Sequence, residues 1–127
     1  MPDEALRPGE TLVFVYGTFL SGERNHHVLG SARFVGEATT RPEFELVDLG
    51  TYPAMVPGGR TSIRGELYAV STIHLQLLDE VEDHPDYYRR TELGLEDGGR
   101  AFGYTLTPDQ ASGFPRIVGG SWRRRAS

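Results

Sequence analysis

Apolar and polar positions along the chain predict about six strands and one helix. A nearly continuous apolar run over residues 11–16 is typical of a strand buried on both faces. Residues 44–48 and 64–70 alternate between apolar and polar side chains, which predicts strands, and residues 34–38 indicate another. Residues 87–95 and 100–106 predict a hairpin around a turn at 97–99. The pattern favours an α+β fold with a closed or nearly closed sheet and helices on its outside.

The remaining segments have weaker patterns. Residues 25–29 predict a short helix that ends at Gly30, and residues 50–59 have turn chemistry around a small apolar segment. A loop over 107–114 leads to a short extended piece near Ile117 and Val118. We expect a single domain over residues 1–127, with loose ends at 1–10 and 120–127.

One strong helical pattern covers residues 72–83 and places an acid among apolar side chains. At about 100° per residue, Glu82 falls between Leu75 and Leu78 on the apolar side, away from the other acids of the segment. Burial, nearby acids and a helix C-terminus all disfavour a carboxylate, so we expect a raised pKa for Glu82. Such a group suits general base catalysis near neutral pH. The alternative is a helix that frays one turn earlier and leaves Glu82 in water.

Composition narrows the class of protein. A chain of 127 residues with 16 Gly and 8 Pro suits one turn-rich domain with a single core. The chain contains neither Cys nor Lys, which excludes disulfides, thiolate catalysis, zinc–cysteine sites and lysine Schiff bases. No apolar run has the length of a membrane span, and the N-terminus does not match a signal peptide. We therefore expect a cytoplasmic protein that does not enter a membrane.

The charge argues against nucleic acid as a partner. The formal net charge is −5, from 13 basic and 18 acidic residues. The basic tail at residues 123–125, beside Trp122, favours a solvated terminus over an RNA contact, because three charges give little phosphate affinity. The sequence leaves the oligomeric state open.

The four histidines do not have the spacing of a metal site. His26 and His27 are adjacent, so on a helix their side chains point about 100° apart. His84 could hold a cation with Asp83 and Asp86, but a turn with solvated charges is favoured. We therefore expect neither a metal nor an organic cofactor.

Nucleophilic and dinucleotide chemistry also lack their motifs. Thr18 or Ser21 could act with a neighbouring histidine, yet the Gly-x-Ser-x-Gly pattern is missing, as is Gly-x-Gly-x-x-Gly after the first strand. What remains is an apolar strand, a glycine-containing loop at 17–22 and one acid on a helix. Exposed backbone N–H groups in such a loop can hold a carboxylate. The loop equally fits a tight turn at Gly17 and nothing more.

Three blocks in register carry a family resemblance. Residues 15–29 contain Tyr-Gly-Thr-Phe-Leu followed by Gly and Asn, and residues 64–70 contain Gly-Glu-Leu-Tyr. Residues 78–82 and 88–90 supply Leu-Asp-x-x-Glu and then Tyr-x-Arg. The chain thus resembles the γ-glutamylcyclotransferase-like superfamily over residues 11–107, in the branch of the γ-glutamylamine cyclotransferases and AIG2-like proteins.

The resemblance implies a small mixed β-barrel with helices packed around it. It also implies an enzyme that cyclises a γ-glutamyl group to 5-oxoproline and releases an amine or amino acid, with Glu82 as general acid/base. Tyr88 would line the pocket, and Tyr52 and Pro53 would form another wall. Arg90 matches a family arginine, either for substrate or for an ion pair with an acid such as Asp79 or Glu92. The loop that would position the substrate consists of Tyr16, Gly17, Thr18, Phe19 and Leu20.

Two departures from the family pattern concern substrate choice. Phe19 stands where the family usually has Leu, and Ser21 stands where a basic residue is common. Little family signal follows residue 108, so the identity of the leaving amine stays open. Two rival hypotheses are a non-catalytic module that binds a small acid in the same pocket, and a fold relative with an unrelated hydrolytic reaction.

Overall fold

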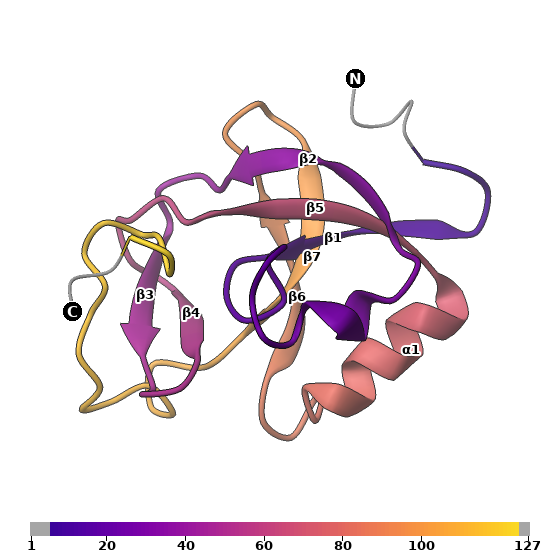
Figure 1. Cartoon of the computed structure of the whole chain (residues 1–127). Coiled ribbons are helices and arrows are strands. Elements are labelled where there is room, and N and C mark those ends of the chain that lie inside the picture. The colour runs from indigo at the N-terminus through magenta and orange to yellow at the C-terminus, as the bar shows by residue number, and fades with distance from the viewer. Residues whose placement is uncertain (1–5, 125–127) are drawn as a thin grey trace.

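The computed structural model describes residues 6–124 and contains seven strands, one α-helix and one short 3-10 helix in that range (Figure 1). The elements follow in chain order: β1 (Glu10–Val15), η2 (His26–Leu29), β2 (Arg33–Thr39), β3 (Phe44–Asp48), β4 (Pro53–Pro57), β5 (Arg64–Ser71), α1 (Thr72–Val81), β6 (Arg89–Gly94) and β7 (Arg100–Thr105). None of the helices within 6–124 has the length and apolar character needed to cross a membrane.

The strands form one mixed sheet in the order β2-β5-β1-β7-β4-β3, with β6 attached to β7. β6 pairs with β7 along its whole length, so β1 and β4 must share the other edge of β7. β1 meets β7 in parallel where Val13 faces Phe102, and β4 meets it in parallel where Met55 faces Thr105. The sheet therefore forks at β7, and the end of β1 separates from the start of β4.

The structure confirms the α+β class and corrects two details of the predicted sheet. It has seven strands within the described range, because residues 53–57 form β4 rather than part of a turn. The sheet is also open, since its end strands β2 and β3 do not pair with each other in residues 6–124. A single bridge between Thr40 and Leu95 connects the chain after β2 to the β6–β7 hairpin, which is too little to close a barrel.

The apolar run of β1 is buried on both faces, as predicted. Val13 and Val15 belong to the core cluster that contains Leu75 and Leu78 of α1, whereas Phe14 and Tyr16 belong to the cluster on the opposite face. Because side chains alternate along a strand, one continuous apolar segment supplies both cores. Figure 1 shows α1 beside η2 on one side, with the β3–β4 hairpin at the other end of the molecule.

Helix α1 begins where the sequence indicates and ends earlier than residue 83. The Ser71 hydroxyl accepts a hydrogen bond from the His74 N–H at 3.1 Å, which caps the N-terminus. The last helical residue is Val81, Glu82 is the C-cap, and Asp83 takes a left-handed backbone with φ of 56°. The chain thus turns sharply just after Glu82.

Both ends of the described chain are packed against the domain. Glu10, at the end of the expected loose segment, begins β1 and forms an ion pair with Arg33 at 2.5 Å. Trp122, in the other expected loose end, is 3% exposed and lies in the core cluster of Phe14. Ile117 is buried, while the extended pairing expected there occurs at Arg116. Residues 1–5 and 125–127 lie outside the described range.

Candidate active site

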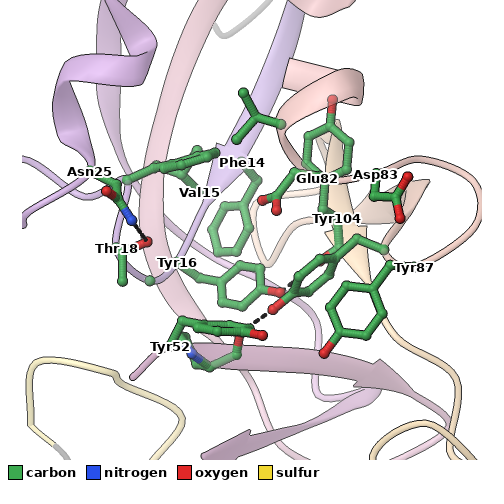
Figure 2. A pocket seen from close by; sticks show the side chains of 15 residues that line it. Phe14, Val15, Tyr16, Thr18, Asn25, Tyr52, Glu82, Asp83, Tyr87 and Tyr104 are labelled. Carbon is green, nitrogen blue, oxygen red and sulfur yellow. Dashed lines mark hydrogen bonds between the residues drawn. The ribbon is translucent and has the colours of Figure 1, made fainter. Parts of the chain in front are cut away.

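A pocket of about 280 Å³ opens where the sheet forks. Its walls come from the end of β1 and the following loop, from the start of β4, from the end of α1 and from β7 (Figure 2). The lining is mainly aromatic, with two carboxylates and no basic side chain among the described residues. The lining residues are Phe14, Val15, Tyr16, Gly17, Thr18, Phe19, Asn25, Tyr52, Pro53, Val81, Glu82, Asp83, Tyr87, Tyr88 and Tyr104.

Glu82 reaches into this pocket beside Phe14, whereas the neighbouring Asp83 side chain is directed away from it (Figure 2). The backbone of Glu82 is held on both sides, because its N–H donates to Leu78 O at 3.0 Å and its C=O accepts from the Tyr88 N–H at 3.2 Å. Within residues 6–124 no hydrogen bond or ion pair reaches its carboxylate. Burial therefore raises the pKa of Glu82 to about 7.

Two tyrosines hold the fork open at a fixed width. The Tyr16 hydroxyl donates to Tyr104 O on β7 at 2.6 Å and accepts from the Met55 N–H on β4 at 3.0 Å. It thereby satisfies two backbone groups that the forked ladder leaves unpaired. The Tyr88 hydroxyl donates to Pro53 O at 2.8 Å. Burial raises the pKa of both phenols, so they stay protonated and keep donating these bonds.

Tyr104 forms a third wall and is anchored outside the pocket. Its hydroxyl donates to Asp79 Oδ1 on α1 at 2.7 Å, and Arg90 Nε lies 3.6 Å from the same oxygen. The Arg90 guanidinium also lies over the Phe102 ring at 5.6 Å. Arg90 is absent from the pocket lining, so the ion-pair alternative for the family arginine is the one observed.

The loop after β1 forms the wall opposite Glu82. Gly17 packs directly on Pro53, because an added Cβ would lie 2.6 Å from the proline ring. Asn25 fixes the next residue, since its N–H and side-chain amide bond to the Thr18 carbonyl and hydroxyl at 3.0 and 3.1 Å. Among residues 6–124 no hydrogen bond occupies the backbone N–H groups of Gly17, Thr18 and Phe19. Three consecutive N–H groups of this kind can bind an anion.

The histidines near the loop have structural roles. His26 Nδ1 donates to Phe19 O at 2.8 Å, and His74 Nε2 donates to Val28 O at 3.0 Å. His84 Nδ1 accepts from the Arg90 N–H at 2.9 Å. Neither Thr18 nor Ser21 is bonded to a histidine within the described chain, so a nucleophile–histidine pair is not assembled. Residues 6–124 also contain no cluster of three His, Asp or Glu side chains that could hold a metal.

The pocket unites most of the residues that the sequence points to. Tyr16, Gly17, Thr18, Phe19 and Tyr88 line it together with Glu82, and the suggested wall of Tyr52 and Pro53 is present. Leu20 is buried but lies outside this lining, facing a second hollow on the outer side of the loop. Sequence analysis missed seven lining residues: Phe14, Val15, Asn25, Val81, Asp83, Tyr87 and Tyr104. Val15, Asn25 and Val81 lie inside the family blocks but were given no site role, and no local motif marks the other four.

Comparison with known proteins identifies the family and supports the fold. The family model described as γ-glutamyl cyclotransferase, AIG2-like, matches residues 13–124. The chain therefore belongs to the AIG2-like γ-glutamylcyclotransferase family. A solved AIG2-like protein from Mus musculus superimposes with a TM-score of 0.69 at 32% identity, over 84% of this chain and 85% of that one. A uropathogenic E. coli-specific protein shares the fold, with a TM-score of 0.80 at 23% identity over 91% and 94%.

Curated relatives carry names from the same family. A Vibrio cholerae protein named provisionally as a γ-glutamylcyclotransferase is 48% identical over 82 residues, which is 65% of this chain and 70% of that protein. γ-Glutamylaminecyclotransferase A of Danio rerio is 36% identical over 115 residues, or 76% of this chain and 71% of its own length. The human γ-glutamylaminecyclotransferase is 39% identical over 94 residues, or 67% of this chain and 61% of that protein.

Proposed function

We propose that this protein cyclises a γ-glutamyl amine or γ-glutamyl amino acid to 5-oxoproline, with Glu82 as the general acid/base. The observation that carries the proposal is one half-buried carboxyl, with a pKa of about 7, in the same pocket as the unoccupied N–H groups of Gly17, Thr18 and Phe19. A carboxyl with that pKa is present in both protonation states near neutral pH, so it can both accept and return a proton.

The reaction is an intramolecular acyl transfer. The α-nitrogen of the γ-glutamyl group attacks its own γ-carbonyl carbon, a C–N bond closes the five-membered lactam, and the C–N bond to the departing amine breaks. Two protons leave the α-ammonium group and two reach the departing nitrogen. Glu82 carries them one at a time and ends in the state in which it began, so no other reactant is needed.

The pocket supports this assignment by its shape and its polarity. The free N–H groups of Gly17, Thr18 and Phe19 would bind the α-carboxylate, because no basic side chain of the described pocket can do so. Holding the substrate curled against the aromatic walls brings the nitrogen close to the carbonyl, and such an arrangement supplies a large share of the rate in an intramolecular reaction. The Tyr87 ring lines the same pocket and would face the leaving group.

The test is release of 5-oxoproline, followed by mass spectrometry, from a panel of γ-glutamyl amines and γ-glutamyl amino acids. Wild type, Glu82→Gln and Glu80→Gln would be compared. Glu80 is an exposed acid on the same helix and serves as the matched control. We expect release by wild type and Glu80→Gln, and a loss in kcat of about a hundredfold to ten-thousandfold for Glu82→Gln, the range that a missing general base typically costs.

Two results would contradict the proposal in different ways. Full turnover by a folded Glu82→Gln variant would remove Glu82 from the mechanism. A panel without turnover, combined with a rise in melting temperature on adding 5-oxoproline, would indicate a binding module for small acids in the same pocket.

A further inference from the structure

A second polar network lies on the outer side of the loop, away from the pocket. Its centre is Glu66 on β5, whose side chain is 6% exposed although it is charged. Oε1 accepts hydrogen bonds from the Ser21 N–H and the Tyr68 hydroxyl, both at 2.9 Å. Oε2 accepts from the Ser21 hydroxyl at 2.9 Å. Burial of a carboxylate is costly, and here it is offset by three hydrogen bonds from donors on the loop and on β5.

The C-terminal segment completes the network through Arg123. Its Nη1 lies 3.6 Å from Glu66 Oε2, its Nη2 donates to the Ser21 carbonyl, and its Nε lies 3.6 Å from Glu23 Oε2. Ser21 is therefore bound through its N–H, its hydroxyl and its carbonyl. Burial opposes ionisation of Glu66, but the Ser21 and Tyr68 donors and the charge of Arg123 together hold its pKa below its usual value. The Glu66 side chain is therefore a carboxylate at neutral pH.

Glu66 and Arg123 are separated from the pocket by the loop itself. Neither residue is among those that line the pocket, whereas Phe19, two positions before Ser21, is. The inner part of the loop is fixed by Asn25 at Thr18 and by His26 at Phe19. On the outer side the loop is held through Ser21. Without the bonds from Ser21 to Glu66 and Arg123, only the contacts of Asn25 and His26 would hold the loop. A buried ion pair that adds little stability can still fix one conformation.

We propose that Glu66 and Arg123 form a clamp on Ser21 that positions the loop at 17–20 to receive the ligand's carboxylate. Both are positioning residues, since they act through Ser21 and do not touch the pocket. The C-terminal segment therefore takes part in ligand binding although it lies outside the site. The kinetic part of this proposal rests on the proposed cyclotransferase function, while its conformational part does not.

Hydrogen exchange of single amides, measured by NMR on the full chain, tests the conformational part. In Glu66→Gln we expect the hydrogen-bonded amides of Leu20 and Ser21 to exchange about tenfold faster or more, the factor for losing one hydrogen bond to a charged group, with β1 amides unchanged. In Arg123→Gln we expect the same amides to exchange about two- to fivefold faster, a smaller effect because this ion pair is partly exposed. Glu37→Gln and Arg124→Gln, exposed residues of the same outer hollow, should match wild type.

Steady-state kinetics distinguish positioning from general destabilisation. We expect KM for the γ-glutamyl substrate to rise about tenfold in Glu66→Gln and less in Arg123→Gln, with kcat within about twofold and the acidic limb of the pH–rate profile in place. Combining both substitutions should raise KM by less than the product of the single effects, because the residues are coupled. Arg123→Lys, which keeps the charge, should recover part of the loss.

Exchange at Leu20 and Ser21 equal to wild type in a folded Glu66→Gln variant would overturn the clamp. If that variant does not fold, Arg123→Gln and Ser21→Ala take its place in the test. Exchange equal to wild type in both of these variants would also overturn the clamp. A uniform rise in exchange over all strands would also overturn it, because it would show a purely structural role. Absence of turnover in wild type would reject the proposed function. The hydrogen-exchange measurements would still test whether Glu66 and Arg123 hold Ser21 in place.

Discussion

Replacing Glu82 by Gln should make the protein more stable at pH 8 and leave its stability almost unchanged at pH 4. In the unfolded chain this carboxyl loses its proton near the ordinary value of 4.5, whereas burial keeps it protonated in the folded protein up to about pH 7. Between these two values the folded state binds more protons than the unfolded state. The contribution of Glu82 to stability therefore falls as the pH rises from 4.5 to 7, and it stays low above 7.

The size of the effect follows from the same shift. A pKa raised from 4.5 to about 7 corresponds to about 3 kcal/mol between the two protonation states. Glutamine has no charge to lose, so the stability gap between Glu82→Gln and wild type should widen by about 2–3 kcal/mol from pH 4 to pH 8. Any cost of seating the amide group is present at both pH values and cancels in this difference.

Urea unfolding of both proteins at half-unit steps from pH 4 to pH 8 would measure the gap directly. Glu80→Gln removes an exposed acid from the same helix and should follow wild type throughout. Parallel curves for wild type and Glu82→Gln would refute the argument, because they would show that folding does not raise the pKa of Glu82. A gap that widens toward low pH would refute it as well.

Three further predictions follow from the geometry of the pocket. The pH dependence of kcat/KM should have an acidic limb with a pKa of about 7, lost in Glu82→Gln, and a limb near pH 4.5 would count against burial as the cause. Tyr16→Phe should lower the free energy of unfolding in urea by about 2–4 kcal/mol, because it leaves two buried backbone groups without a hydrogen bond. Tyr87→Phe, a change at a partly exposed residue, should lower it by less than about 1 kcal/mol. Gly17→Ala should lower the melting temperature by several degrees and raise KM, because the added Cβ would lie 2.6 Å from a proline ring. In the control Gly119→Ala the added Cβ meets no atom within 4 Å, so neither the melting temperature nor KM should change. Equal effects of the two alanine substitutions would contradict the packing at Gly17.

Local patterns in the sequence were sufficient to predict the two elements on which the proposed chemistry depends, the first strand and the helix that leads to Glu82. The apolar run of β1 and the helical period before Glu82 depend on neighbouring residues, and the structure confirms both elements. The end of α1 shows the limit of such reasoning. The helix stops at Val81, two residues before the predicted end and less than the full turn of the fraying alternative, and Glu82 stays half-buried because Tyr88 and the pocket walls cover it. Contacts formed after the helix decided the environment of this acid.

Long-range pairings account for the features that were missed. The segment of β4 is bounded by Pro53 and Pro57, which locally favours turns, and it becomes a strand because β3 and β7 offer it two edges. The contact of Arg123 with Ser21 spans 102 positions, and that of Tyr16 with Tyr104 spans 88. Patterns within a window of 10–20 residues carry no information on such pairs.

The tyrosines explain how a pocket rich in hydroxyl groups can be apolar around Glu82. The hydroxyls of Tyr16 and Tyr88 are used to join strands, and that of Tyr104 is used to join β7 to α1. Each phenol therefore turns its polar end to the scaffold and leaves its ring to the cavity, so none of the three solvates the carboxylate. The same hydrogen bonds that hold the fork of the sheet at a fixed width also remove hydrogen-bond donors from Glu82. Fold and pKa are coupled at this site, because the bonds that fix the fork are the ones that keep these donors from the acid, and a donor to the carboxylate would lower its pKa.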